Sequence, residues 1–201
     1  MKPSLDWISM AKSDDKTRHN LCGVWRYQTY LVAADGHRMH YQDGLDRIAK
    51  DYMLNGTEAT PLAFEVAIPD PPTTAECTIK TDKALIQKLR AMDKAITACC
   101  KHAAVTVEID TMEITISYES RDYSASMRLD LNENSLGTGK ACLKFKYLID
   151  ALDIHNSTRE TVWATIGIRA ELDPITVHHA LGSAVIMPCK LRTKKTNDTN
   201  E

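Results

Sequence analysis

Residues 82–102 read DKALIQKLRAMDKAITACCKH, and this stretch decides the fold class. Asp82 is a suitable N-cap, and apolar side chains then recur at steps of three and four, which predicts a long amphipathic helix. Three segments of alternating apolar and polar residues follow at 105–110, 113–120 and 124–131, and they predict strands of an antiparallel sheet. The apolar stripe of the helix consists of Leu85, Ile86, Leu89, Met92, Ile96, Cys99 and Cys100.

The same order of elements is found again nearer the C-terminus. An internal repeat of a helix followed by three strands favours an α+β fold built from repeated helix-plus-antiparallel-sheet units. The second unit consists of a helix at 145–154, with Leu148, Ala151 and Leu152 facing inward, and of strands at 162–169, 175–181 and 184–190.

The first part of the chain gives weaker patterns. The prolines within 69–72 can neither continue a helix nor donate to a sheet, so we place a domain boundary in this region. The predicted organisation is one shortened domain at 1–75, a complete domain at 76–191 and a disordered polar tail at 192–201. The elements predicted before the boundary are a helix at 3–12, two strands within 21–34, an extended segment at 38–41, a helix at 43–54 and a strand at 62–68.

Composition excludes several classes of protein. A formal net charge of -2 argues against a uniformly basic nucleic-acid coat, although a local basic surface is compatible with it. Six cysteines in 201 residues are too few for a disulfide scaffold, which favours reduced thiols. There is no apolar stretch typical of a signal peptide and no run of about 18 apolar residues. We therefore expect a cytoplasmic protein that makes no membrane contact.

One face of the predicted helix at 82–102 is basic. Its residues recur at steps of three and four and lie opposite the apolar stripe, with four cations and no acid among them. Two interpretations are open: the face contacts nucleic-acid phosphates without reading bases, or it is merely solvated. The residues of this face are Lys83, Gln87, Arg90, Lys94, Thr97 and Lys101.

No arrangement of residues predicts catalysis, a metal site or a cofactor. Residues 137–140, GTGK, lack the spacing of a phosphate-binding P-loop and are predicted to form a turn. Cys99, Cys100 and His102 have no second ligand pair at zinc-finger spacing, so core packing is predicted for both cysteines. The two histidines at 178–179 are adjacent on a strand and must point to opposite faces. A binding protein is expected rather than an enzyme.

Three segments resemble the bacterial DNA polymerase III beta sliding clamp family. Residues 14–24, DDKTRHNLCGV, and 31–39, LVAADGHRM, are similar to a D-x-R-x-x-L-x-G run that precedes V-A-T-D-G-H-R-L in that family. Residues 184–191, AVIMPCKL, look like its closing V-V-M-P-M-R-L. The resemblance extends over 77–191 for the family's last domain and over 1–75 for part of its middle domain.

The resemblance implies a DNA-clamp fold, in which helices line a ring around duplex DNA and sheets form its outer rim. It also implies a hydrophobic pocket that binds a short peptide from DNA polymerase and other partners, with a clamp loader as a further partner. The DNA-binding residues would be Lys80, Lys83, Arg90, Lys94, Lys101 and Lys146. The pocket residues would be Ala34, Gly36, His37, Arg38, Met39, Val185, Met187, Pro188, Cys189 and Leu191.

The sequence also departs from the family. It has no counterpart of the family's first domain, as expected of a phage or mobile-element protein, and Ala34, Cys189 and Lys190 replace the usual Thr, Met and Arg. Rings of this family present about twelve helices to DNA, and cyclic symmetry divides them equally. A homotrimer is expected if the helix at 43–54 lines the hole, and a homotetramer if it does not. The alternative is a clamp-like regulator or decoy that keeps the pocket but forms no ring.

Overall fold

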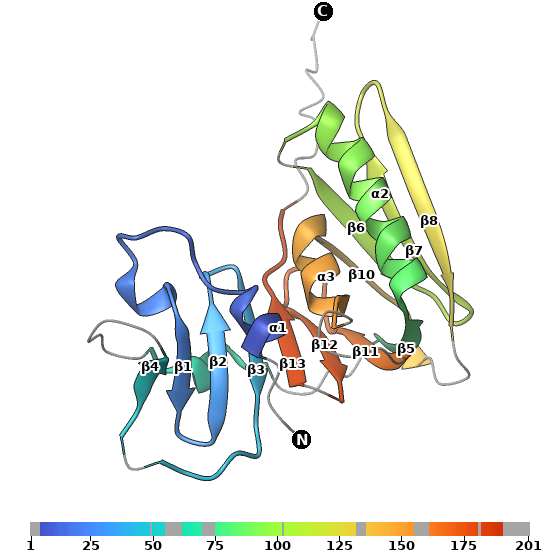
Figure 1. Ribbon diagram of the computed structural model, residues 1–201. Coiled ribbons are helices and arrows are strands. Elements are labelled where there is room, and N and C mark those ends of the chain that lie inside the picture. Colours follow the sequence, from blue (N-terminus) through green and yellow to red (C-terminus); the bar gives the residue numbers. More distant parts are fainter. Residues whose placement is uncertain are drawn as a thin grey trace, which may run out of the picture.

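Figure 1 shows the computed structural model, in which helices lie against two antiparallel sheets. The structure describes residues 5–48, 50–54, 62–69, 75–101, 103–131, 136–154, 161–180 and 182–190. The helices within these ranges are α1 (Leu5–Ser9), α2 (Lys83–Cys99) and α3 (Phe145–Leu152), with 3-10 helices η1 (His19–Leu21) and η2 (Phe64–Ala67). The strands are β1 (Val24–Tyr27), β2 (Tyr30–Ala34), β3 (Arg38–Gln42), β4 (Tyr52–Leu54), β5 (Ala75–Thr81), β6 (Ala104–Ile109), β7 (Glu113–Glu119), β8 (Ser124–Asp130), β9 (Leu136–Gly137), β10 (Gly139–Lys144), β11 (Val162–Ile168), β12 (Ile175–His179) and β13 (Gly182–Ile186).

The larger sheet contains strands from both halves of the chain. Its order is β4-β1-β2-β3-β13-β12-β11-β5-β9. At its centre β13 pairs antiparallel with β3, so that Ser183 lies opposite Tyr41 and Ile186 lies opposite Arg38. The two predicted domains therefore share one continuous sheet. Residues 70–74 and 192–201 lie outside the described residues, so the boundary near 69–72 and the disordered tail remain predictions.

The smaller sheet and α2 confirm the predicted helix-plus-sheet unit. This sheet has the order β10-β6-β7-β8, and α2 packs against α3 beside it. The Asp82 side chain caps α2 by accepting a hydrogen bond of 2.8 Å from the Leu85 N–H. The α+β fold is confirmed, and so are the three strands after α2 and the inward residues of α3. The side chains that α2 buries are Ile86, Leu89, Met92 and Ile96.

The predicted helix at 43–54 is wrong. Residues 43–48 have no regular structure, and β4 follows as an edge strand paired with β1. Local polar contacts explain the difference, because the Asp43 carboxylate accepts hydrogen bonds from the Gly44 N–H (2.6 Å) and the Thr29 hydroxyl (2.8 Å). Gly44 also has a φ of +81°, which a helix cannot accommodate. These turn contacts override the helical spacing of the apolar residues.

Two further predictions are corrected. The strand predicted at 62–68 is instead irregular apart from η2, and only Phe64 of η2 is buried. Cys99 and Cys100 are exposed rather than packed in the core. The reason is that α2 ends at Cys99 and Cys100 is already extended, with φ of -148° and ψ of 107°, so the apolar stripe stops at Ile96.

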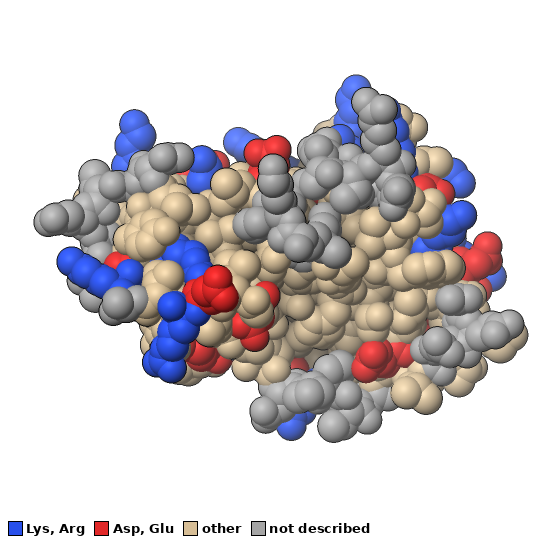
Figure 2. All heavy atoms as spheres, turned by 60° about the horizontal axis from the view of Figure 1, so that its bottom comes forward, with Lys and Arg blue, Asp and Glu red and all other residues tan. Residues whose placement is uncertain are grey.

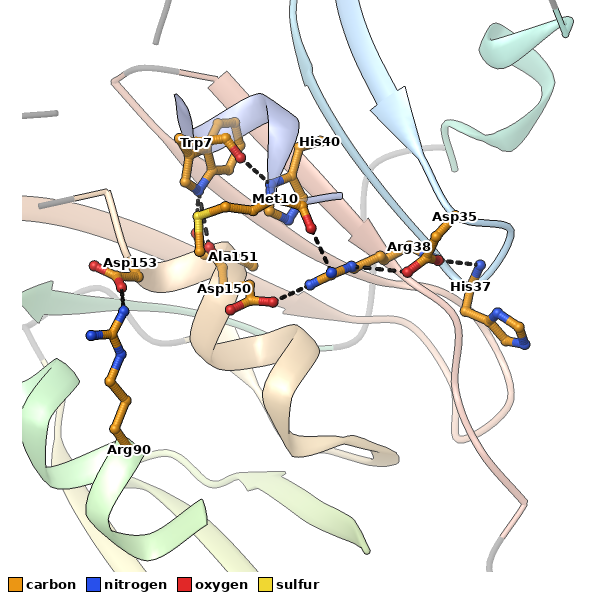
Figure 3. Close-up of polar contacts among 10 residues, drawn as sticks. All are labelled: Trp7, Met10, Asp35, His37, Arg38, His40, Arg90, Asp150, Ala151 and Asp153. Carbon is orange, nitrogen blue, oxygen red and sulfur yellow. Dashed lines mark hydrogen bonds and ion pairs between the residues drawn. The ribbon is translucent and has the colours of Figure 1, made fainter. Parts of the chain in front are cut away.

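A buried aromatic and ionic network fixes α1 against the sheet (Figure 3). The Trp7 indole N–H donates to the backbone carbonyl of Asp150 at 3.1 Å, and the Trp7 ring stacks on His40 at 4.4 Å between centroids. His40 is fully buried, with its Nδ1 2.9 Å from the Trp7 carbonyl oxygen. Burial lowers the pKa of His40 to about 3, and it lowers the pKa of His179, whose ring makes an edge contact with Trp7, to about 4.

Stability is expected to fall as the pH drops below about 6.5. His40 and His179 stay neutral in the folded state but bind protons at about pH 6.5 when unfolded, so each favours folding above that pH and loses this contribution as the pH falls towards 4. The expected slope is up to about 1.4 kcal/mol per pH unit for each histidine. Urea unfolding between pH 7.5 and 5 measures it. His40→Gln should flatten the slope, whereas a change at exposed His37 should not; an unchanged slope in His40→Gln contradicts the assignment.

Candidate functional site

The predicted basic face of α2 is open to solvent. Lys83, Arg90 and Lys94 of α2 are exposed, and so is Lys101, which lies two residues beyond the end of the helix and not on it as predicted; the opposite stripe of the helix is buried. None of the three lysines forms an ion pair with any other described residue. Their ammonium groups are therefore available to an anionic partner that approaches α2 from the side away from the sheet.

Arg90 differs from these lysines because it already has a partner. Its guanidinium pairs with the carboxylate of Asp153, which follows α3 (Figure 3). The Asp153 side chain is only 4% exposed, whereas that of Arg90 is 56% exposed. Arg90 therefore compensates a buried charge between α2 and α3, and only the outer part of its guanidinium remains open to an anion.

Lys146 and Lys80, the two remaining residues predicted to bind DNA, lie in different parts of the structure. Lys146 is exposed near the start of α3, and Asp93 of α2 lies close to it: burial and the Asp150 charge raise the pKa of Asp93, while Lys146 opposes them. Lys146 therefore extends the basic face of α2. Lys80 does not, because its neighbours on β5 point into the core and Lys80 points to the opposite face of the sheet, beside Trp163.

The two motif segments of the predicted pocket lie side by side. The pairing of β3 with β13 places Met39 opposite Val185, and beyond it the Met187 N–H donates to the His37 carbonyl at 2.8 Å. The turn at 35–37 is closed by Asp35, whose carboxylate accepts from the His37 N–H at 2.8 Å and the Arg38 N–H at 3.0 Å. Gly36 adopts a φ of +91° in this turn, which favours glycine.

The predicted pocket residues differ in exposure. Ala34, Met39 and Val185 are at most 9% exposed and belong to a second apolar cluster, together with Trp25 and Phe64. These buried residues can form only the floor of a binding site. Leu191 lies outside the described residues. The residues that present a surface are Gly36, His37 and Met187, which are exposed, and Pro188 and Cys189, which are half-buried.

Solved structures with the same arrangement come from several bacteria. The beta subunit of DNA polymerase from Streptococcus pyogenes matches with a TM-score of 0.75 at 17% identity, over 93% of this chain and 62% of that chain. The sliding clamp of Bacillus subtilis matches at 0.74 and 15% identity, over 93% and 61%, and the DNA polymerase III beta subunit of Thermotoga maritima at 0.72 and 16%, over 93% and 62%. The chain has the sliding-clamp fold. It spans about 62% of the length of these structures. No protein-family model and no curated protein sequence matches it.

Within this sliding-clamp fold, Arg38, which the resemblance places in the pocket, has a buried side chain. Its side chain is 7% exposed, and its guanidinium pairs with the carboxylates of Asp35, at 3.1 Å, and Asp150 (Figure 3). It also donates to the Met10 carbonyl and lies 4.5 Å above the Tyr147 ring. Arg38 thus connects β3, α1 and α3, and its role is to hold the pocket turn on the rest of the clamp fold.

Sequence reasoning missed a polar cleft next to this turn. The cleft has a volume of about 380 Å³ and lies between the start of α3 and the loop after α1. Lys144 is in it, with its ammonium 4.8 Å from the Tyr147 ring centroid. A cation directly before the helix at 145–154 was visible in the sequence, but its proximity to the loop after α1 depends on the tertiary fold. The basic residues of the cleft are Lys12, Arg18, Arg38, Lys144 and Lys146.

Basic side chains occupy separate parts of the clamp-fold surface. Figure 2 shows one face on which the centre carries few charged groups, while Lys and Arg gather nearer its ends.

The described residues contain no group of three or more His, Cys, Asp or Glu side chains placed to hold a metal ion. Gly137 and Gly139 of the predicted turn belong to β9 and β10, with Thr138 between them. None of the helices in the described ranges has the length and hydropathy of a bilayer-spanning segment.

Proposed function

We propose that the protein is a DNA sliding clamp, which encircles duplex DNA and tethers replication proteins through a peptide-binding pocket. The observation that carries this proposal is the solvent-exposed basic face of α2 on a sliding-clamp fold. Such a protein is a processivity factor and not an enzyme, and we expect it to act in the cytoplasm. Its partners would be double-stranded DNA of any sequence, a DNA polymerase, other proteins with a clamp-binding peptide, and a clamp loader.

The basic face suits phosphates rather than bases. Lys83 and Lys94 project from α2, and Lys101 follows two residues after the end of this helix; flexible ammonium groups form point-charge contacts that do not depend on sequence. Lys146 of α3 adds a fourth charge beside them. The protein as a whole has a net charge of -2, so attraction to DNA depends on this local surface.

A partner peptide is expected to bind at the turn 35–37 and the segment 187–190. Met187 is 45% exposed, and Pro188 and Cys189 are half-buried next to it, so the surface is apolar and adaptable. Below it, Met39 and Val185 form a rigid floor. This site would take the apolar anchors of a short peptide.

The substitution Met187→Glu is expected to weaken peptide binding by at least about 30-fold, because it places an unpaired charge in an apolar contact. The probe is a fluorescent peptide with a glutamine and spaced Leu and Phe anchors, titrated with the full chain. Met112→Glu is the matched control, since Met112 is 82% exposed in the β6–β7 turn. If Met187→Glu and Met112→Glu bind the peptide with equal affinity, the peptide does not bind at this pocket.

A tetrameric ring is expected from the number of helices. The helix predicted at 43–54 does not exist, so the described part of each chain offers α1, α2 and α3 to the hole. Four chains then supply the dozen helices expected of a ring of this family. Light scattering at micromolar concentration should give four times 22.5 kDa. A strict monomer at this concentration would contradict the ring.

The alternative function is a clamp-like regulator or decoy. One observation favours it: the chain spans about 62% of the length of the solved clamps, so it matches only part of their ring-forming chains. A decoy would bind the partner peptide as a monomer and would not bind DNA. The mass in solution and the salt dependence of DNA binding together separate the two functions.

A further inference from the structure

Two cysteines meet at the edge of the smaller sheet. Cys142 lies in β10 and is 1% exposed, but it belongs to neither apolar cluster. Its neighbours Ala141 and Leu143 pack in the main core, so strand alternation directs the Cys142 side chain to the other face of the sheet. The segment 187–190 lies along β10, where the Cys189 N–H donates to the Cys142 carbonyl at 2.7 Å.

This contact places the two thiols within reach of each other. Directly opposed residues that exchange two backbone hydrogen bonds have Cα atoms about 5.5 Å apart, inside the range of about 4.4–6.8 Å found for disulfides, and the single bond from Cys189 to Cys142 brings these two backbones to a similar approach. Burial raises the pKa of the Cys142 thiol to about 11, and the nearby Cys189 is its second cause. The backbone hydrogen bond and the influence of Cys189 on the Cys142 thiol therefore agree that the two side chains are neighbours.

We propose that Cys142 and Cys189 are a thiol-modification site, at which a small disulfide such as oxidised glutathione forms a reversible intramolecular disulfide. The other four cysteines have no comparable neighbour among the described residues. Cys22 donates to the Asp15 carbonyl, Cys77 is buried in the core, and a bridge between the adjacent Cys99 and Cys100 is geometrically awkward. Disulfides of cytoplasmic proteins are typically transient and redox-sensing, which suits a buried thiol beside the half-buried Cys189.

The reaction proceeds in two exchange steps. The half-buried Cys189, as its thiolate, attacks one sulfur of oxidised glutathione; a mixed disulfide forms and one glutathione thiolate leaves and takes up a proton. Cys142 then loses its proton to water, and its thiolate attacks the Cys189 sulfur, releasing the second glutathione. The two protein thiols are oxidised by two electrons and oxidised glutathione is reduced to two molecules of glutathione.

The disulfide would alter the proposed peptide site, and this consequence rests on the proposed function. Cys189 follows Met187 and Pro188, which belong to that site. A bond from Cys189 to β10 would fix the segment 187–190 and draw the Cys189 side chain away from the peptide. Oxidation is therefore expected to weaken peptide binding by about tenfold, because the segment can no longer adapt to its ligand.

The test uses the full chain with Cys22, Cys99 and Cys100 changed to serine, which removes the more exposed competing thiols. The reduced protein is incubated with oxidised glutathione, and the intact mass and the cross-linked peptides are followed by mass spectrometry. The expected product has lost two hydrogen atoms and links Cys142 to Cys189. Its formation from the mixed disulfide should accelerate about tenfold per pH unit between pH 7 and 8, because Cys142 titrates only near 11.

Matched variants separate the outcomes. Cys142→Ala should stop at the glutathione adduct of Cys189, and Cys189→Ser should form no disulfide. If the glutathione adduct of Cys189 persists in the parent protein and no Cys142–Cys189 disulfide forms, the inference is overturned, whether or not the protein binds the peptide. If the disulfide forms but the reduced protein binds no peptide, the modification site is supported and the proposed pocket fails. If oxidised and reduced proteins bind the peptide equally, the regulatory consequence is overturned.

Discussion

Replacing Arg38 with methionine is expected to destabilise the protein by about 3–5 kcal/mol, because it leaves two carboxylates without their partner inside the structure. The side chains of Asp35 and Asp150 are 14% and 12% exposed, so water cannot take over the role of the guanidinium. Methionine retains most of the aliphatic stem but not the guanidinium that lies above the Tyr147 ring, so the loss reports the contacts of the guanidinium and not those of the stem. Urea unfolding followed by circular dichroism measures the difference.

Arg128→Met is the matched control for this prediction. Arg128 also contacts a carboxylate, that of Glu113 at 3.7 Å, but its side chain is 77% exposed. Such surface pairs contribute at most about 1 kcal/mol. If Arg38→Met and Arg128→Met lose similar, small amounts of stability, Arg38 does not hold the turn, α1 and α3 together.

A variant with Lys83, Lys94 and Lys101 changed to alanine is expected to bind duplex DNA about 100- to 1,000-fold more weakly at low salt. Each lysine that meets a phosphate releases counterions, so the slope of log K against log salt should fall by about 0.9 for each lysine removed. Arg90 is left unchanged, since its loss would leave the buried Asp153 carboxylate without its ion-pair partner. Fluorescence anisotropy of labelled duplexes between about 50 and 200 mM salt measures both quantities.

Single substitutions supply the control. Lys94→Ala should reduce the salt slope, whereas Lys80→Ala should not, because Lys80 lies on the opposite face of the sheet. The reductions should also be the same for duplexes of unrelated sequence, since no base is read. Equal slopes for the triple variant and the parent protein would show that the basic face of α2 is merely solvated.

The parts of the fold that follow from local periodicity could be predicted from the sequence. A capped apolar stripe located α2, and strict alternation located β6, β7 and β8. The segment 43–54 shows the limit of this reasoning. Its apolar residues have helical spacing, but hydrogen bonds of the Asp43 side chain, one of them to the β1–β2 turn, favour an irregular conformation over a helix. Strand β10 was missed, since its continuous apolar residues next to glycine gave no alternation.

The position of the candidate site along the chain could be predicted from the sequence, but the burial of its side chains could not. Motif resemblance identified both segments, and the β3–β13 pairing brings them together. Burial could not be inferred from the motif: Arg38 stands between exposed His37 and buried Met39, and its place depends on Asp150, 112 residues further along the chain. The same reason explains why the polar cleft between Lys12 and Lys144 was not anticipated.

The backbone ladder between β3 and β13 also bears on how such a ring could open. Four residue pairs of two extended strands cannot separate without breaking several hydrogen bonds together, and Arg38 reinforces the junction from one side. The two halves of the chain therefore have no hinge at this position. If the proposed ring forms, a gap that admits DNA would have to open at the contacts between separate chains and not within one of them.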